Sequence, residues 1–310
     1  MLTAAIEGKP EAPVGRIESV LKHFDLRRLD ESVPYITGRG FQITTVGKRF
    51  DSMQNLRNLD TRVKLTSAEI PDISIYNAYL PKDAGVSMVS GKGKVSADFR
   101  LKGVSGSGNL EMLAKGVEVH VRDQTIKGDL RISTRLTNGN LEAMTFDASG
   151  TQLRIDNGSL EIGDVTQDEQ WWGQINVTHG RMTWKRPLHL DGTINMQLRD
   201  SGLLVHLFVK QSQGRQWLND LLTIRDVAGE SQVLLNDNSI VLKNTRLAGE
   251  KLLVLATLRL SEEKMRGGMF AKYGNMGIGV ELKDDQRTLK LVNPQKWYKG
   301  FSEAFRPGQF

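Results

Sequence analysis

GKGKVSADFRL, residues 91–101, and IKGDLRISTRL, residues 126–136, decide the fold of this chain. In both stretches apolar and polar side chains alternate strictly. In the first, the apolar set is Val95, Ala97, Phe99 and Leu101, and the polar set is Lys94, Ser96, Asp98 and Arg100. A period of two is typical of a β-strand with one buried and one solvated face. The two stretches therefore predict a sheet with one apolar and one charged face.

Short segments rich in glycine and asparagine separate the strands between Gly91 and Ile162. They are too short for a crossover helix, so neighbouring strands should pair antiparallel. The alternation returns in LHLDGTINMQL, residues 188–198, where Gly192 matches Gly128. This weak internal repeat indicates an array of similar hairpins. The predicted fold is mainly β: a long, twisted antiparallel sheet with a few short amphipathic helices.

Helical spacing of apolar residues predicts four helices, over residues 16–29, 72–80, 212–223 and 295–305. Asn293 would cap the last helix and Pro294 would begin it. Trp217 in the third helix, and Trp297 and Phe301 in the fourth, should be buried against the sheet.

Other segments carry local expectations. Residues 1–14 should be a disordered lead, and residues 170–187 a hairpin turning at His179–Gly180. SEEKMRGG, residues 261–268, should be a flexible connection. The strand over 251–260 is apolar on both faces from Leu252 to Leu258, so it should be covered on both sides.

The chain divides by pattern into three parts. Residues 1–33 are an N-terminal lead and helix, and residues 34–200 are a repetitive antiparallel segment. Residues 201–310 are a C-terminal β segment with amphipathic helices.

Charge and cysteine usage narrow the possible partners. The 42 lysines and arginines exceed the 36 acidic residues by only six, and they are spread along the strands as outward-facing alternates. Aromatic residues make up 6% of the chain. A nucleic-acid surface would cluster its basic residues and interleave aromatics, so we expect a solvated face and no nucleic-acid partner. The lack of cysteine excludes disulfides and thiolate metal sites.

No catalytic constellation stands out. The five histidines lack metal-ligand spacing, and we expect no metal and no cofactor. Trp171, Trp172 and Trp184 could stack on a sugar, but a glycosidase needs two positioned carboxylates, and no convincing pair accompanies them. Packing into the core explains these tryptophans more simply. The sequence therefore predicts a protein that is not an enzyme.

The N-terminal sequence has charged residues where a signal peptide needs an apolar run, and no stretch reaches the ~18 apolar residues of a membrane span. We therefore expect either a cytosolic chain or a mature or truncated piece of a larger protein.

The order of elements carries a resemblance. NAYLP is followed by SGKGKVSADFRLKG, SGSGNLEM and GVEVHV, then by several hairpins and RQWLNDLLTI. The closing part is GESQVLLNDNSIVLKNTRLAGEKLLVLATLRL and GNMGIGVELKDDQRTLKLVNPQKWY. This order, over most of residues 34–300, resembles the AsmA-like proteins of Gram-negative envelopes, relatives of TamB and YdbH in the bridge-like lipid-transfer superfamily.

The resemblance implies a curved, groove-shaped sheet, taco-like in section, whose apolar interior holds phospholipid acyl chains. It also implies a periplasmic location, contact with the inner or outer membrane, and a role in outer-membrane biogenesis or homeostasis. The family is usually anchored in the inner membrane by an N-terminal helix that this chain does not contain. No catalytic residues are implied.

A sheet with one apolar face must bury that face, and either a lipid-filled groove or a second sheet in a dry sandwich would do so. The first solution implies lipid transfer, and the second implies a structural or adhesive β-protein. If the face is a groove, the inward residues of the most regular strands line it. These are Val95, Ala97, Phe99, Leu101, Leu110, Met112, Leu130, Ile132, Ile194, Met196 and Leu198.

Overall fold

The computed structural model describes residues 2–7, 14–29, 31–48, 59–121, 124–162, 165–201, 224–261, 264–284 and 286–305. Strands make up 72% and helices 7% of these residues. All nineteen described strands belong to one antiparallel sheet. The mainly β prediction is therefore confirmed, and the described strands form one sheet rather than two sheets facing each other.

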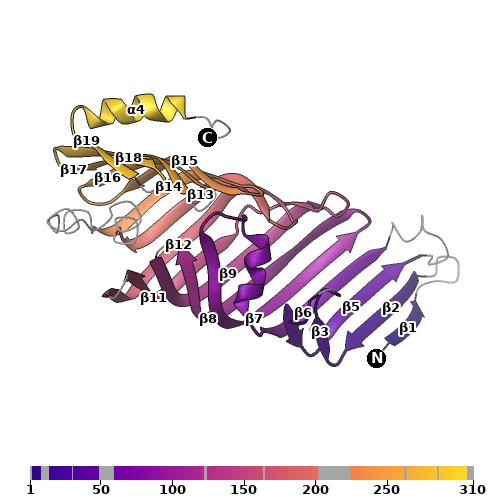
Figure 1. Ribbon diagram of the computed structural model, residues 1–310. Coiled ribbons are helices and arrows are strands. Elements are labelled where there is room, and N and C mark those ends of the chain that lie inside the picture. The colour runs from indigo at the N-terminus through magenta and orange to yellow at the C-terminus, as the bar shows by residue number, and fades with distance from the viewer. Residues whose placement is uncertain are drawn as a thin grey trace.

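Apart from the short β3, β4 and β10, the strands follow one another across the molecule in chain order, from the indigo N-terminal end to the yellow C-terminal end (Figure 1). The first nine are β1 (Leu2–Glu7), β2 (Val14–Leu21), β3 (Phe24–Leu26), β4 (Ile36–Gly38), β5 (Phe41–Gly47), β6 (Asp60–Ile70), β7 (Val86–Lys102), β8 (Ser105–Val121) and β9 (Gln124–Asn140). The others are β10 (Thr145–Asp147), β11 (Gln152–Ile162), β12 (Val165–Thr183), β13 (His189–Asp200), β14 (Arg225–Leu235), β15 (Ser239–Ala248), β16 (Leu252–Ser261), β17 (Lys264–Tyr273), β18 (Met276–Lys283) and β19 (Gln286–Lys290).

Two of the predicted helices are present. The 3-10 helix η1 (Ile73–Tyr79) lies between β6 and β7, and the Asp72 side chain caps it by accepting a hydrogen bond from the Ser74 amide. The α-helix α4 (Pro294–Ala304) follows β19 and has proline in its first turn, as expected. Asn293 occupies the cap position in a left-handed conformation, but its side chain makes no capping hydrogen bond.

The N-terminal helix prediction was wrong. Residues 14–21 form β2, which pairs with β1 on one side and β5 on the other. The apolar spacing over 16–29 fits a helix, but the two strand partners satisfy the backbone of β2 instead, and tertiary pairing overrides a short local pattern. For the same reason residues 2–7 are an edge strand rather than part of a disordered lead.

Two further local predictions were wrong. Residues 165–183 are the single strand β12, and His179–Gly180 lies within it, next to a register shift after Val177. The glycine therefore marks a bulge, which is a usual reason for glycine inside a strand. The expected flexible connection over 261–268 is strand from Lys264 onward, in β17. The predicted strand over 202–209, and the helix over 212–223 with Trp217, lie outside the described residues.

The prediction that one strand is covered on both faces is confirmed. On β16, Val254, Ala256 and Leu258 are buried on one face, and Thr257 is buried on the other. The helix α4 lies over that second face, where the Tyr298 hydroxyl is 3.2 Å from the Thr257 hydroxyl. The sheet is thus covered on its outer face at its C-terminal end.

Candidate functional site

The apolar face of the sheet is the candidate site, and strand register makes it continuous. Val95 on β7 lies directly opposite Met112 on β8, and Met112 lies opposite Ile132 on β9. The chain of opposite partners continues through every strand from β6 to β18 except the short β10. Its members are Ala68, Val95, Met112, Ile132, Leu153, Ile175, Met196, Gly229, Leu247, Val254, Ala271 and Ile278.

We call these twelve residues the apolar row. It contains no polar side chain across twelve strands. Because adjacent strands lie about 4.8 Å apart, the row is roughly 50 Å long. It crosses the strands at right angles, so it follows the long dimension of the sheet.

All eleven residues predicted to line a groove lie on the face that carries the row. Val95, Met112, Leu130, Ile194 and Leu198 are each less than one-tenth exposed. The other six are half-buried: Ala97, Phe99, Leu101, Leu110, Ile132 and Met196.

The structure brings these residues into four neighbouring clusters. Six of them pack together around Met112: Val95, Ala97, Leu110, Met112, Leu130 and Ile132. Phe99 packs with Leu136 and Met182, and Ile194 and Met196 pack with Val177. Leu198 joins the C-terminal cluster with Trp171 and Val227. Leu101 shares the face but belongs to none of the four.

Glycines beneath aromatic rings shape this face. A Cβ on Gly108 would lie 2.3 Å from the Phe99 ring, and one on Gly173 would lie 2.5 Å from the Trp171 ring. Each ring therefore occupies space that the side chain of any other residue at the glycine position would need. Phe99 and Gly108 face each other across β7 and β8, whereas Trp171 and Gly173 lie two residues apart on β12.

Trp171 and Trp172 point to opposite faces, so they form no common platform for a sugar. Trp171 is buried in the C-terminal cluster, as the core interpretation predicts, and its indole N–H has no hydrogen-bond partner among the described residues. Trp172 lies under the Arg154 guanidinium, which is 4.9 Å from the ring centroid. Trp184 is 40% exposed and packs edge-on against Tyr79.

The helix η1 lies on the apolar face and connects two distant parts of the sheet (Figure 1). Its first residue, Ile73, is fully buried in the cluster around Met112. The Tyr79 carbonyl accepts a hydrogen bond of 2.9 Å from the Leu188 amide, in the connection between β12 and β13. The Asp237 carbonyl, in the turn between β14 and β15, accepts one of 3.1 Å from the Lys82 amide. η1 therefore ties β7 to the later strands.

Arg186 extends this connection to the N-terminal strands. It donates to the Glu31 carboxylate at 3.1 Å and to the Tyr35 hydroxyl, and its guanidinium lies 5.0 Å from the ring centroids of both Tyr35 and Tyr79. The hydrogen bonds from Tyr35 and Arg186 lower the pKa of Glu31. Burial raises the pKa of Tyr76, next to this cluster, to about 12. The Arg186 cluster is thus a charged connection between the N-terminal strands and the segment that follows β12.

The opposite face of the sheet is charged and self-paired. Arg62 bonds Asp98 at 2.5 Å, Lys127 bonds Glu161 at 2.8 Å, and His120 lies 3.4 Å from Glu118. Cross-strand pairs of opposite sign stabilise such a charged, solvated face. Among the described residues, no three histidine, aspartate or glutamate side chains lie close enough to hold a metal ion. Neither described helix is long and apolar enough to cross a bilayer.

Comparison with known proteins adds nothing to this geometry. No family model, no curated protein and no solved structure matches the chain.

Proposed function

We propose that this chain binds phospholipid acyl chains on its apolar face and passes them along the row from strand to strand. The observation that carries the proposal is the unbroken apolar row across twelve strands. The row is about 50 Å long, whereas the acyl chains of one leaflet span about half of a ~30 Å hydrocarbon core. A single lipid would cover only part of it, so the row has the dimensions of a path.

The energetics suit transfer without an energy source. Burial gains about 0.8 kcal/mol per CH₂, so a sixteen-carbon chain gains at most roughly 13 kcal/mol on leaving water. The same chain gains almost nothing on leaving a bilayer, because both environments are apolar. Lipid could therefore enter and leave the face in either direction, and no catalytic residue or cofactor is needed.

The resemblance to the AsmA-like proteins supports this proposal and adds a cellular location. On that reading the chain belongs to a Gram-negative envelope protein that works in the periplasm between inner and outer membranes. The full-length form would be anchored in the inner membrane, and the lipid it carries would serve outer-membrane biogenesis or homeostasis.

A structural or adhesive β-protein is the second candidate, and one observation favours it. Val95, Met112, Leu130, Ile194 and Leu198 are already buried by neighbouring protein side chains without any lipid. A face that its own side chains fill could serve as a dry core that stiffens an extended sheet.

Ile132→Asp distinguishes the two candidates. Ile132 is half-buried in the middle of the row, so a carboxylate there could reach water if the face opens to lipid, and the protein should stay folded. The charge would interrupt the apolar path. We expect a soluble, folded variant that loses most of its crosslinking to a photoreactive phospholipid supplied in detergent.

Ser133→Asp is the matched control, because Ser133 is the next residue along β9 and points to the charged face. It should crosslink like the wild-type protein. A wild-type protein that never crosslinks, or an Ile132→Asp variant that fails to fold, would favour the dry core instead.

A further inference from the structure

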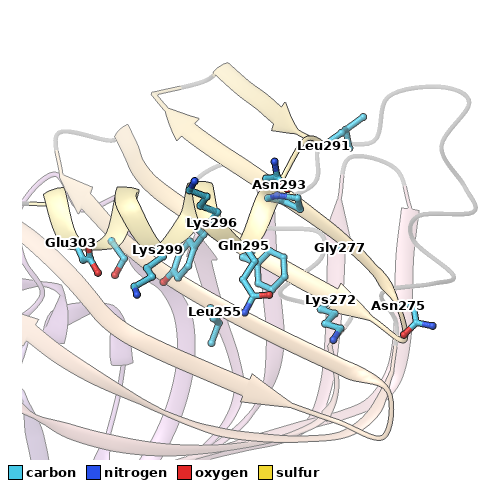
Figure 2. A pocket seen from close by; sticks show the side chains of 14 residues that line it. Leu255, Lys272, Asn275, Gly277, Leu291, Asn293, Gln295, Lys296, Lys299 and Glu303 are labelled. Atoms are coloured by element: carbon cyan, nitrogen blue, oxygen red, sulfur yellow. The ribbon is translucent and has the colours of Figure 1, made fainter.

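The C-terminal end of the sheet carries a cleft that the lipid path does not use. The cleft, of about 960 Å³, lies between α4 and the outer face of β16–β18 (Figure 2). Leu255, Phe270 and Tyr298 supply its apolar lining. The helix cannot move closer to the sheet, because Phe301 lies against Gly268 and Trp297 lies against Gly279. The cleft is therefore a fixed feature of this end.

Three large apolar side chains protrude from the sheet edge beside the cleft. Met276 is 57% exposed, Leu291 is 67% exposed and Val292 is 84% exposed. Lys290 ends β19 opposite Gly279 on β18, so Leu291 and Val292 continue past it toward the edge where Met276 begins β18. Leu291 is also one of the residues that line the cleft (Figure 2). One edge thus presents three aliphatic side chains to solvent.

Three lysines line the cleft beside this edge. Lys272, Lys296 and Lys299 line the cleft and are exposed, and none of them pairs with a carboxylate in the described parts of the chain. Glu303 is the only acidic residue among the residues that line the cleft. The lining of the cleft thus carries a net positive charge.

We propose that this end of the sheet docks on the surface of a bilayer that contains anionic phospholipid. Leu291, Val292 and Met276 would enter the headgroup region, and the three lysines would contact lipid phosphates. Exposed apolar side chains together with nearby lysines are the combination that holds peripheral proteins on anionic membranes. Lysine is a flexible point charge and suits a fluid layer of headgroups, whereas recognition of one fixed partner favours arginine.

This proposal rests on the proposed function, since a lipid path must be loaded or emptied at a membrane. It adds the site of contact. The apolar row reaches Ile278 on β18, two residues along the same strand from Met276. Docking would therefore bring the end of the path to the bilayer.

The test is flotation with vesicles. The whole chain should float with vesicles of phosphatidylcholine and phosphatidylglycerol, bind pure phosphatidylcholine vesicles much more weakly, and be released by salt. Lys296→Glu with Lys299→Glu should weaken binding by more than about thirtyfold, since the loss of each lysine near an anionic surface costs about a factor of five and each new glutamate adds repulsion. Leu291→Asp with Val292→Asp should weaken it by roughly tenfold or more.

Control variants make the same chemical changes at the other end of the molecule. Leu26 is 55% exposed on β3 and Leu29 is fully exposed, so Leu26→Asp with Leu29→Asp removes exposed apolar surface there. Lys92→Glu with Lys115→Glu reverses two exposed lysines that lie opposite each other on β7 and β8. Both controls should float like the wild-type protein, and circular dichroism should show every variant folded.

Crosslinking in detergent separates this proposal from the proposed function. The Leu291→Asp, Val292→Asp variant should lose flotation and still crosslink to photoreactive phospholipid, whereas Ile132→Asp should do the reverse. A wild-type protein that does not float, or charge-reversed variants that float normally, would overturn the docking proposal even if the row crosslinks. Such a result would leave a protein partner as the occupant of this edge.

Discussion

Strands β7–β9 and strands β16–β17 belong to the same sheet, yet they are buried in different ways. On β7, Val95 is buried on the inner face, whereas Lys94 and Arg100 on the outer face are exposed. On β17, Met269 is buried on the inner face and Phe270 on the outer face, where α4 covers it. The outer-face residues therefore decide whether a helix packs there, because the inner face is apolar in both regions.

The covering of one face or both faces changes the free-energy cost of placing a charge on the apolar row. A strand that is covered on both faces has no route for water to reach a new charge, whereas a strand covered on one face can relax toward solvent. The same substitution on the apolar row should therefore have different costs in the two regions.

The largest expected effect comes from Val254→Asp. Val254 belongs to the same row as Ile132, but its strand β16 is covered on both sides and Val254 is 8% exposed. We expect the variant to lose about 3–5 kcal/mol of unfolding free energy or to aggregate. Denaturant titration of Val254→Asp and Ile132→Asp measures the difference between their losses of unfolding free energy. Equal losses for the two variants would show that both regions are closed to water, and the comparison would fail.

An intermediate effect is expected where α4 meets the sheet. A Cβ on Gly268 would lie 2.5 Å from the Phe301 ring, so Gly268→Ala should push the helix away and cost about 1–3 kcal/mol. Gly300, also in α4, has no atom within 4 Å of its Cβ position, and Gly300→Ala should gain about 0.5–1 kcal/mol through helix propensity. Thermal unfolding of the two variants gives opposite shifts if the helix is docked as described. Shifts of the same sign would contradict it.

The smallest effect is expected on the solvated face of the N-terminal strands. The hydrogen bond and charge of Arg62 lower the pKa of Asp98 below the usual carboxyl value of 3.8. A lowered folded-state pKa stabilises the fold above 3.8, and this contribution disappears as the pH falls through the lowered value. The pair is exposed, so Asp98→Asn should cost less than about 1 kcal/mol at neutral pH.

Denaturant titrations at neutral pH and well below pH 3.8 check this last prediction. The difference between wild-type and Asp98→Asn proteins should be present at the first pH and absent at the second. A cost that persists in acid would show that the carboxylate has a packing role.

The face of each regular strand was predictable from sequence, because a period of two fixes it. The alternation alone assigns Val95, Ala97, Phe99 and Leu101 to the apolar face, and their partner strands need not be known. Register was not predictable, since glycines and bulges set it: the shift after Val177 places a turn-like His179–Gly180 inside β12. Only Val95, Met112, Ile132 and Met196 of the apolar row were among the predicted lining residues, because the others become row members only through the register.

The two ends of the chain were harder to predict for a different reason. The apolar residues in 16–29 suit a helix locally, and only the partners β1 and β5 make the segment a strand. The position of α4 on the outer face depends on Gly268 and Gly279, which are small enough to admit Phe301 and Trp297. Small residues at facing positions indicate where a helix can pack on a sheet, but which positions face each other is known only from the strand pairing.

The Arg186 cluster has a consequence for the order in which the molecule folds. Nearly every strand pairs with a neighbour in the chain, so most hairpins can close as soon as their second strand has been synthesised. The hydrogen bond between Arg186 and Glu31 joins residues 155 positions apart, and it cannot form until β12 is complete. The N-terminal strands must therefore remain without this contact during most of synthesis. Their early pairing depends on local hairpins alone. The contact between Arg186 and Glu31 can form only after the first twelve strands have been synthesised.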